Sequence, residues 1–392
     1  MVELAINGGD PVLDYSLPTV EDISGRDIGD EEMALVSEVI RSGNLGYLHG
    51  TKLRQFQDEW RKKFNVSTAV AVSSGTAALH TAMIFLGIGP GDEVLVPAIT
   101  DMGTVIAVLL QNAVPVFVDV KARTQNMDPD KMEKMISKNT KAVIPVHLYG
   151  FPCDMDPIME IAEKHGLFVV EDCCQAHLAG YKGRLVGTIG DLGCFSFQQS
   201  KHMTTGDGGM VITNRDNLCG RKLIHCADKG WPREQYREHL FLAPNYHMTD
   251  LQAAVGIAQF RKLEGFIEKR RRNAILLSSL INDIPGVFPP PEIPGMRHTY
   301  YEYALDIEPE LYSENTEKIA GALCSEGVKT APGYLPKPIY MYEMIGKPPE
   351  ICPVALKACS SMLYIPWNEK LTEKNVFDIA KAIRKVLTYY LK

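Results

Sequence analysis

The chain has 392 residues, of which 45% are hydrophobic and 23% are charged. These fractions are typical of a globular protein and exclude a wholly disordered or fibrous one, while the length suits a large domain with a smaller one. The formal net charge of -7 argues against nucleic acid as the main partner, because phosphate binding requires a basic surface.

The first residues show no basic region followed by an apolar stretch, and no apolar run reaches the roughly 18 residues that a membrane span needs. The nine cysteines are odd in number and lack the spacing of a disulfide scaffold. Cys173 and Cys174 are adjacent, so we predict small buried residues rather than a redox pair or zinc ligands. These features predict a reduced, cytoplasmic protein that does not contact a membrane.

From about residue 66 the sequence alternates short apolar runs with helical patterns. The strands are predicted at 66–72, 93–97, 114–120, 142–147 and 167–170. Between them, helices are predicted at 73–86, 104–110, 130–136 and 156–165. This alternation favours a mainly parallel sheet with helices on both faces, and continuous apolar strands are typical of such sheets.

After residue 191 the pattern changes. Two strands, 194–197 and 209–213, are predicted on either side of a Gly-rich turn, and a helical pattern from about 248 to beyond 280 is expected to bridge two lobes. Further along are a predicted strand at 300–307 and predicted helices at 316–326 and 374–391. We expect three parts: an N-terminal segment 1–30 beside the small domain, a large domain 31–265 and a small C-terminal domain 266–392.

Polar residues at strand ends are the first candidates for ligand binding, because ligands of such sheets bind at the carboxyl ends of strands. Residues 73–76 lie between a strand and a helix, where free N–H groups and hydroxyls suit a phosphate, although Ser and Thr are also ordinary helix caps. Asp172 closes an apolar strand and could bind a sugar or a cationic ring, or cap a helix. No cluster with metal-ligand spacing accompanies it, so we predict no metal.

Lys201 follows the predicted strand 194–197 and precedes the turn 206–209. Burial would lower the pKa of this lysine and make its amine nucleophilic, whereas a lysine reaching into solvent is the equal alternative. The combination is more specific than its parts. A phosphate cradle, Asp172 and Lys201 are what pyridoxal 5'-phosphate (PLP) needs: an amine for a Schiff base, a carboxylate for the pyridine nitrogen and a helix N-terminus for the phosphate.

Six short sequence blocks, in the order in which they occur along the chain, resemble the DegT/DnrJ/StrS family of sugar aminotransferases. The similarity runs from about residue 4 to about residue 345. The blocks are 73–79, 89–94, 171–176, 195–197 with Lys201, 206–209 and 245–248. The resemblance implies the aspartate aminotransferase fold, an α/β fold with a large, mostly parallel mixed sheet between helices and a smaller C-terminal α+β domain. It also implies PLP as the cofactor and a homodimer with shared active sites.

The resemblance also implies a role for each matching residue. Lys201 would form the Schiff base and later move the proton, Asp172 would pair with the pyridine nitrogen, and Gln175 would hydrogen-bond the phenolic oxygen of the cofactor. The phosphate would be held by Ser74, Gly75, Thr76 and Ser196 of one subunit, together with Asn245 of the partner subunit.

The chain departs from the family after the strand 94–99, where an aromatic residue usually stacks on the cofactor ring. Here Thr100 is followed by Asp101 and Met102. We expect Met102 to cover the ring more weakly, and Asp101 to lie at the cofactor and meet the substrate or the amino donor.

Two other activities compete with transamination. The PLP-dependent hexulose dehydratases of this family carry a histidine at the position of Lys201, so the lysine favours transamination, although residues 202–206 look similar to theirs. A PLP-binding regulator without turnover is disfavoured, because no DNA-binding domain is appended and the chain is acidic.

We therefore predict transfer of an amino group from L-glutamate, or L-glutamine, to a carbonyl of a sugar-derived acceptor. The N-terminal residues 5–9 and the segment 200–203 resemble the branch that aminates inososes. An excess of lysine over arginine instead favours the C8 aldehyde of a 3,8-dideoxy-octulosonate for lipopolysaccharide, with an inosose or a nucleotide-linked keto sugar as alternatives. The candidates for contacting the sugar are His202, His298 and Lys337, for which core or surface roles are the alternative.

Overall fold

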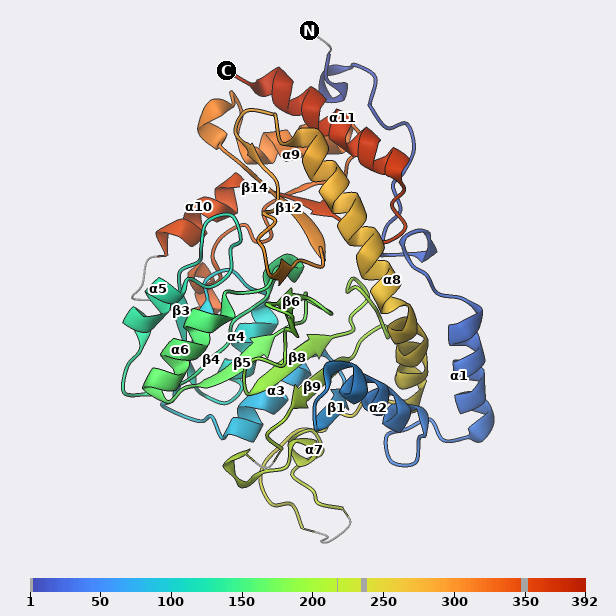
Figure 1. The fold of residues 1–392 in the computed structure, drawn as a ribbon, viewed down its shortest axis with the longest axis vertical. Helices are drawn as coiled ribbons and strands as arrows, with labels where there is room; N and C mark the ends of the chain where they lie inside the picture. Colours follow the sequence, from blue (N-terminus) through green and yellow to red (C-terminus); the bar gives the residue numbers. More distant parts are fainter. Residues whose placement is uncertain (1–2, 217, 234–237, 347–351) are drawn as a thin grey trace.

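The computed structural model describes residues 3–216, 218–233, 238–346 and 352–392. Its centre is a seven-stranded sheet with the strand order β1-β9-β8-β5-β4-β2-β3 (Figure 1). The strands are β1 (Thr68–Val72), β2 (Glu93–Pro97), β3 (Val114–Val118), β4 (Thr140–Val143), β5 (Phe168–Asp172), β8 (Leu192–Ser196) and β9 (Gly209–Thr213). The predicted fold is confirmed.

Six strands of this sheet run in one direction, and β9 alone is antiparallel to its neighbours β1 and β8. The carboxyl ends of β1, β2, β5 and β8 therefore meet at one edge. The strand predicted over 142–147 ends earlier, at Val143, because Pro145 has no N–H for the ladder. Pairing resumes beyond it, where His147 N donates to the carbonyl of Asp172 at 3.1 Å and thereby holds the end of β5.

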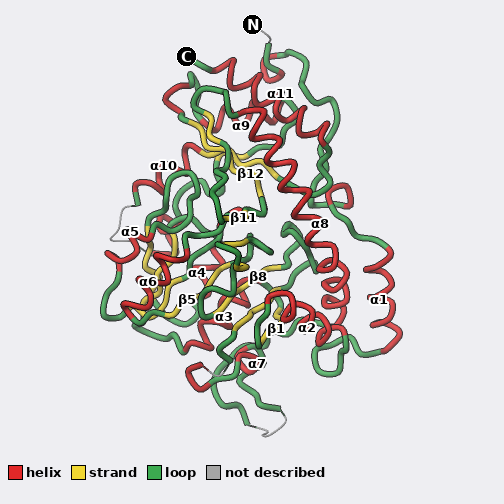
Figure 2. The backbone as a smooth tube through the Cα atoms, in the orientation of Figure 1, coloured by secondary structure: helices red, strands yellow, loops and turns green. Residues whose placement is uncertain are grey.

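Helices cover both faces of the sheet (Figure 2). Alternation along each strand divides the apolar side chains between the two faces: Val70 and Val72 pack on the side of α3, and Ala71 packs on the side of α2. The covering helices are α2 (Lys52–Phe64), α3 (Gly75–Leu86), α4 (Met102–Leu109), α5 (Pro129–Met132), α6 (Met155–His165) and α7 (Leu223–Cys226).

No element is predicted for the stretch that forms helix α2. Its buried side chains Leu53, Phe56, Trp60 and Phe64 recur at helical spacing and form one face. Trp60 contacts the ring of Phe195 on β8 edge to face, with 5.2 Å between ring centroids. Helix α2 therefore supports the strand that leads to Lys201.

The C-terminal part has its own antiparallel sheet with the order β10-β12-β14-β13, and a small sheet β11-β6-β7 joins it to the large part. The strands are β6 (Gly180–Tyr181), β7 (Arg184–Leu185), β10 (Val287–Phe288), β11 (Met296–Arg297), β12 (Glu302–Ile307), β13 (Ala331–Pro332) and β14 (Met362–Pro366). The helices are α9 (Thr316–Ser325), α10 (Pro353–Ser361) and α11 (Glu373–Tyr390).

The predicted bridging helix is α8 (Asp250–Ile281), which begins at a capping box of Thr249 and Gln252 and passes residue 265 without a break. Figure 1 shows it running from the large sheet to the C-terminal sheet, with α1 (Asp30–Ser42) packed alongside. The first residues lie on the C-terminal part, where Ala5 N and Val12 N donate to the Glu326 carboxylate at 2.9 and 3.0 Å. Among the helices described, none is long and apolar enough to cross a membrane.

Candidate active site

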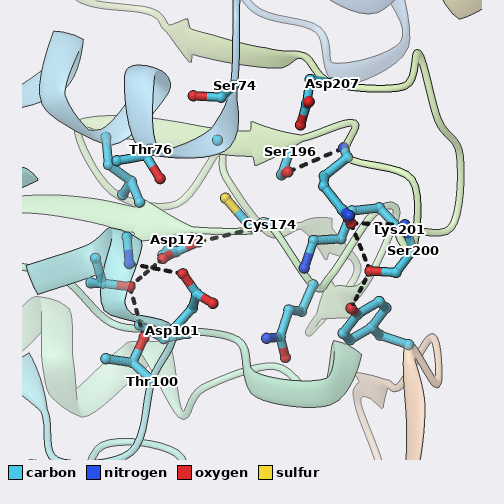
Figure 3. A pocket seen from close by; sticks show the side chains of 18 of the residues that line it. Ser74, Thr76, Thr100, Asp101, Asp172, Cys174, Ser196, Ser200, Lys201 and Asp207 are labelled. Carbon is cyan, nitrogen blue, oxygen red and sulfur yellow. Dashed lines mark hydrogen bonds between the residues drawn. The ribbon is translucent and has the colours of Figure 1, made fainter. Parts of the chain in front are cut away.

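A pocket of about 350 Å³ opens at the edge where the carboxyl ends of β1, β2, β5 and β8 meet (Figure 3). Side chains from the large sheet form one side, and residues from the C-terminal part close the other. It brings together most of the residues predicted to bind the cofactor, namely Ser74, Gly75, Thr76, Asp101, Asp172, Gln175, Ser196 and Lys201.

The N-terminus of α3 forms one wall of this pocket. Ser74 caps the helix, with its hydroxyl accepting a hydrogen bond from Ala77 N at 3.0 Å. The remaining first-turn N–H groups have no partner within the helix and suit an anion. Gly75 is required here, because a Cβ atom on it would lie 2.7 Å from Cβ of Ser196. The close approach of α3 to the end of β8 makes a cradle that fits a phosphate.

Asp172 is held at the floor of the pocket and is only 4% exposed. Its Oδ2 accepts a hydrogen bond from the Thr104 hydroxyl at 2.8 Å, and its Oδ1 accepts one from Cys174 N at 3.0 Å. Thr104 is itself held by the Thr100 hydroxyl at 2.7 Å. Two donors thus fix the carboxylate while it keeps acceptor capacity for a protonated ring nitrogen.

The neighbouring acid, Glu171, faces the opposite side of β5. Its carboxylate accepts bonds from Gly187 N, Ile189 N and Gly190 N at 2.8, 2.7 and 2.7 Å and meets His147 Nε2 at 3.1 Å. His147 and Cys173 lie close enough to share an ion with it. The other ring nitrogen of His147 accepts from a backbone N–H at 2.9 Å, so we interpret this cluster as a buried structural network.

Lys201 lies in the loop after β8, with Nζ 4.3 Å from the ring centroid of Tyr301. The sequence left two alternatives, a buried lysine with a lowered pKa and a solvent-exposed lysine; in the structure Lys201 has a pKa above the ordinary value. Burial lowers the pKa, but Tyr301, Cys174 and Asp101 raise it by more, so it lies above the ordinary value. The amine is therefore an ammonium at neutral pH and must lose a proton before it can attack an aldehyde.

A tyrosine from the C-terminal part closes the pocket. The Tyr334 hydroxyl accepts a hydrogen bond from Gln175 Nε2 at 3.0 Å and donates to Asp101 Oδ2 at 3.3 Å. Gln175 Oε1 accepts from Tyr149 N at 2.9 Å, so its amide is oriented with the nitrogen toward Tyr334. Asp101 Oδ1 caps α4 through Gly103 N at 2.8 Å. Asp101, at the position where the resemblance implies an aromatic residue, is thus held at both carboxylate oxygens.

Tyr301, Tyr334 and Thr104 belong to this site, but sequence reasoning did not single them out. Tyr301 directly precedes β12, Tyr334 lies in a loop of the C-terminal part, and Thr104 lies inside α4. None of the three stands in a motif. The only available signal was the aromatic content of the segments around residues 301 and 334, which core packing explains equally well.

Five predicted residues lie outside the pocket. Met102 starts α4 and packs on the apolar core. His202 is fully buried between His177 and the Thr299 carbonyl, at 3.3 and 3.0 Å, and burial holds its pKa well below the ordinary value.

Two more of these five residues have partners of their own. His298 is buried with Nε2 3.1 Å from the carbonyl of Tyr149, and burial lowers its pKa to about 3. Lys337 lies over the ring of Tyr342, with 5.2 Å from Nζ to the centroid. Asn245 is exposed and lies in a separate cleft beside Tyr47 and His247.

With Lys201 and the anchored Asp172 facing the N-terminus of α3, this pocket fits the class of enzymes that hold pyridoxal phosphate. The chain belongs to the DegT/DnrJ/EryC1/StrS aminotransferase family, whose profile matches residues 26–384. It is therefore a PLP-dependent sugar aminotransferase.

Relatives in the family act on different acceptors. The chain is 36% identical to a UDP-N-acetyl-3-dehydro-alpha-D-glucosamine 3-aminotransferase of Acidithiobacillus ferrooxidans, over 91% of this chain and 94% of that protein. It is 35% identical to the L-glutamine:2-deoxy-scyllo-inosose aminotransferase of Streptomyces kanamyceticus, over 86% and 82%. The structure of an aminotransferase from Psychrobacter cryohalolentis superposes with a TM-score of 0.87 at 32% identity, covering 93% and 98%.

Proposed function

We propose that this enzyme transfers an amino group from L-glutamate or L-glutamine to the keto group of a nucleotide-linked sugar. The relative from Acidithiobacillus, whose name states a UDP-linked 3-dehydro sugar, supports this acceptor class. An inosose is the second candidate, supported by the Streptomyces relative, whose name also states L-glutamine as the donor. The octulosonate aldehyde expected from the sequence finds no support in these relatives, and Lys337 and His298, the residues expected to bind an acidic sugar, lie outside the pocket.

One observation carries the chemical part of the proposal: Lys201 and Asp172 share a pocket with the N-terminus of α3. Bound PLP supplies an aldehyde for the amine and an electron-accepting ring. In our proposal the Lys201 amine would hold the cofactor and, when free, would be the group that accepts and returns the proton of the donor's α-carbon. Asp172 keeps the ring nitrogen protonated, Gln175 orients the ring, and Gly75, Thr76 and Ser196 hold the phosphate.

We further propose that the active form is a homodimer in which Asn245 of the partner subunit completes the phosphate site. The segment that leads to Asn245 carries Leu240, 58% exposed, and Leu242, 98% exposed. Large apolar side chains exposed to this degree beside Asn245 suit burial against a second copy, and this supports the arrangement. Sedimentation of the purified protein tests it, and Asn245→Ala should weaken PLP binding without changing the oligomeric state.

The test of the function is spectroscopic and then chemical. The absorbance of the PLP-loaded enzyme is recorded before and after excess L-glutamate or L-glutamine, and a change to the spectrum of the aminated cofactor identifies the donor. The aminated enzyme is then offered UDP-linked and GDP-linked keto sugars, scyllo-inosose and the octulosonate aldehyde, and products are identified by mass spectrometry. The proposal fails if neither donor changes the spectrum, or if amination is confined to the octulosonate.

A further inference from the structure

The N-terminal segment, which runs beside α8 (Figure 1), reaches the loop that carries Lys201. Arg26 is the contact, and it is only 2% exposed. Its Nη1 donates to the carbonyl of Lys201 at 2.7 Å, its other terminal nitrogen donates to the carbonyl of Gln199, and its Nε donates to the carbonyl of Val20 at 3.4 Å. One guanidinium therefore joins the N-terminal segment to the two carbonyls that flank Ser200.

A buried guanidinium is costly unless it is paired. Within the part of the chain that the structure describes, no carboxylate lies within ion-pair distance of Arg26, and its direct partners are carbonyl oxygens. Burial lowers the pKa of Arg26 to about 10, a shift that nearby Glu369 opposes and Arg270 adds to, so the side chain stays charged at neutral pH. The planar fork of an arginine suits this task, because it can hold two carbonyls in one fixed geometry.

The opposite side of the loop is held by the C-terminal part. The Tyr301 hydroxyl lies 2.7 Å from the Ser200 hydroxyl, and the Tyr301 ring lies beside the Lys201 amine. Arg270, which is fully buried and paired with Glu369 at 2.8 Å, donates to the carbonyl of Tyr301 at 3.1 Å. The loop is thus clamped between two buried arginines, one acting on its backbone and one acting through Tyr301.

We infer that Arg26 is a positioning residue for Lys201, which directs the lysine amine into the pocket by fixing the carbonyls of Gln199 and Lys201. This inference rests on the proposed role of Lys201 as the residue that binds the cofactor. It gives the N-terminal segment a part in the chemistry, beyond covering the surface of the C-terminal domain.

The test compares Arg26→Gln with a matched control, Asn368→Ala. Asn368 is also buried and ties the same segment through the carbonyl of Pro18 at 2.8 Å, but it does not bond to the lysine loop. Each apoprotein is mixed with PLP, samples are reduced with borohydride over time, and mass spectrometry measures the fraction of Lys201 that carries the cofactor. Melting temperature and steady-state kinetics are measured in parallel.

We expect Arg26→Gln to slow attachment at Lys201 and to lower kcat by roughly tenfold or more, with little change in KM for the donor, because a misplaced reacting group costs rate rather than binding. Asn368→Ala should lower the melting temperature and leave the attachment rate unchanged. If both variants attach PLP at the wild-type rate, or slow it equally, Arg26 has only a structural role and the inference is wrong.

Failure of the proposed function and failure of the variant to fold can each be distinguished from failure of the inference about Arg26. If wild-type protein shows no cofactor on Lys201 after reduction, the proposed function fails rather than the role of Arg26. If Arg26→Gln does not fold, Arg26→Lys decides the matter, because it keeps the charge but cannot bridge two carbonyls with one geometry. An attachment rate equal to wild type in a folded Arg26→Lys protein would overturn the inference.

Discussion

The two sides of the pocket are built in different ways. On the side of the large sheet, the functional groups sit at strand ends and a helix start, each next to the turn that orients it: Ser74 and Gly75 at the start of α3, Asp172 at the end of β5. On the other side, Tyr301, Tyr334 and Arg26 reach the pocket or its loop from distant parts of the chain. The first side carries groups placed by local turns, and the second side depends on contacts between segments that are far apart in the chain.

The largest effect should come from Lys201→Ala. Loss of proton transfer alone should lower the rate of the donor half-reaction by about 10²–10⁴-fold, and no cofactor should be found attached after borohydride reduction. Stopped-flow absorbance with L-glutamate measures the rate, and Lys164→Ala, at an exposed lysine, is the control. Retained turnover in Lys201→Ala would show that another group moves the proton.

Asp172→Asn tests the anchored carboxylate. The amide keeps the shape and an oxygen for Cys174 N, but it cannot hold a positive charge on the ring nitrogen. We expect the half-reaction to slow by about 10²–10³-fold, as for other lost electrostatic contacts in active sites. Circular dichroism should show an unchanged fold, and near wild-type kinetics would refute the assigned role.

Gly75→Ala tests the cradle at the start of α3. The new methyl group would collide with Ser196, so α3 must shift away from β8. We expect a loss of about 1–3 kcal/mol in the free energy of unfolding and weaker PLP binding, measured by denaturant titration and by equilibrium dialysis. Gly89→Ala is the control, because a Cβ atom there meets nothing within 4 Å.

Glu302 is a buried acid of the C-terminal part, next to Tyr301, and its titration links stability to pH. Burial raises its pKa to about 8, which Arg270 and Tyr364 lower only in part. The folded protein therefore keeps a proton that the unfolded chain loses above its ordinary pKa of 4.5, and the free energy of unfolding falls as the pH rises from about 4.5 to about 8.

Glu302→Gln keeps an oxygen for Trp367 N and removes this titration. It should stabilise the protein more at about pH 8 than at about pH 5, with a difference of about 1–3 kcal/mol in the free energy of unfolding. Denaturant titrations at the two pH values measure it. An equal effect at both would mean that Glu302 is ionised in the folded protein.

The smallest effect should come from Tyr334→Phe. It removes the hydroxyl that links Gln175 and Asp101 while keeping the ring packed on Tyr149. We expect kcat/KM for the acceptor to fall by a few-fold, in line with one hydrogen bond of about 1 kcal/mol. Asp101→Asn should behave similarly, and unchanged kinetics in both would show that the bridge does not orient the site.

Most of the fold was predictable, because its strands are continuous apolar runs and its helices carry periodic apolar faces. The exceptions have local causes. Pro145 ends β4 early, and the helix predicted over 130–136 is four residues of α5 followed by a 3₁₀ turn, Glu133–Met135. His202 and His298 show a different limit of sequence reasoning: a buried neutral histidine and a ligand-binding one look the same in a sequence.

By itself the sequence determined the family, the sheet and the groups at strand ends, because a strand, a glycine and a polar turn are neighbours in the chain and carry their geometry with them. Only the tertiary structure decided which groups face Lys201. Arg26 lies 175 residues from Lys201, and Tyr301 lies 101 residues from Ser200, the neighbour of the lysine. Contacts at such separations depend on how α8 and the two sheets pack, and no local pattern encodes that packing.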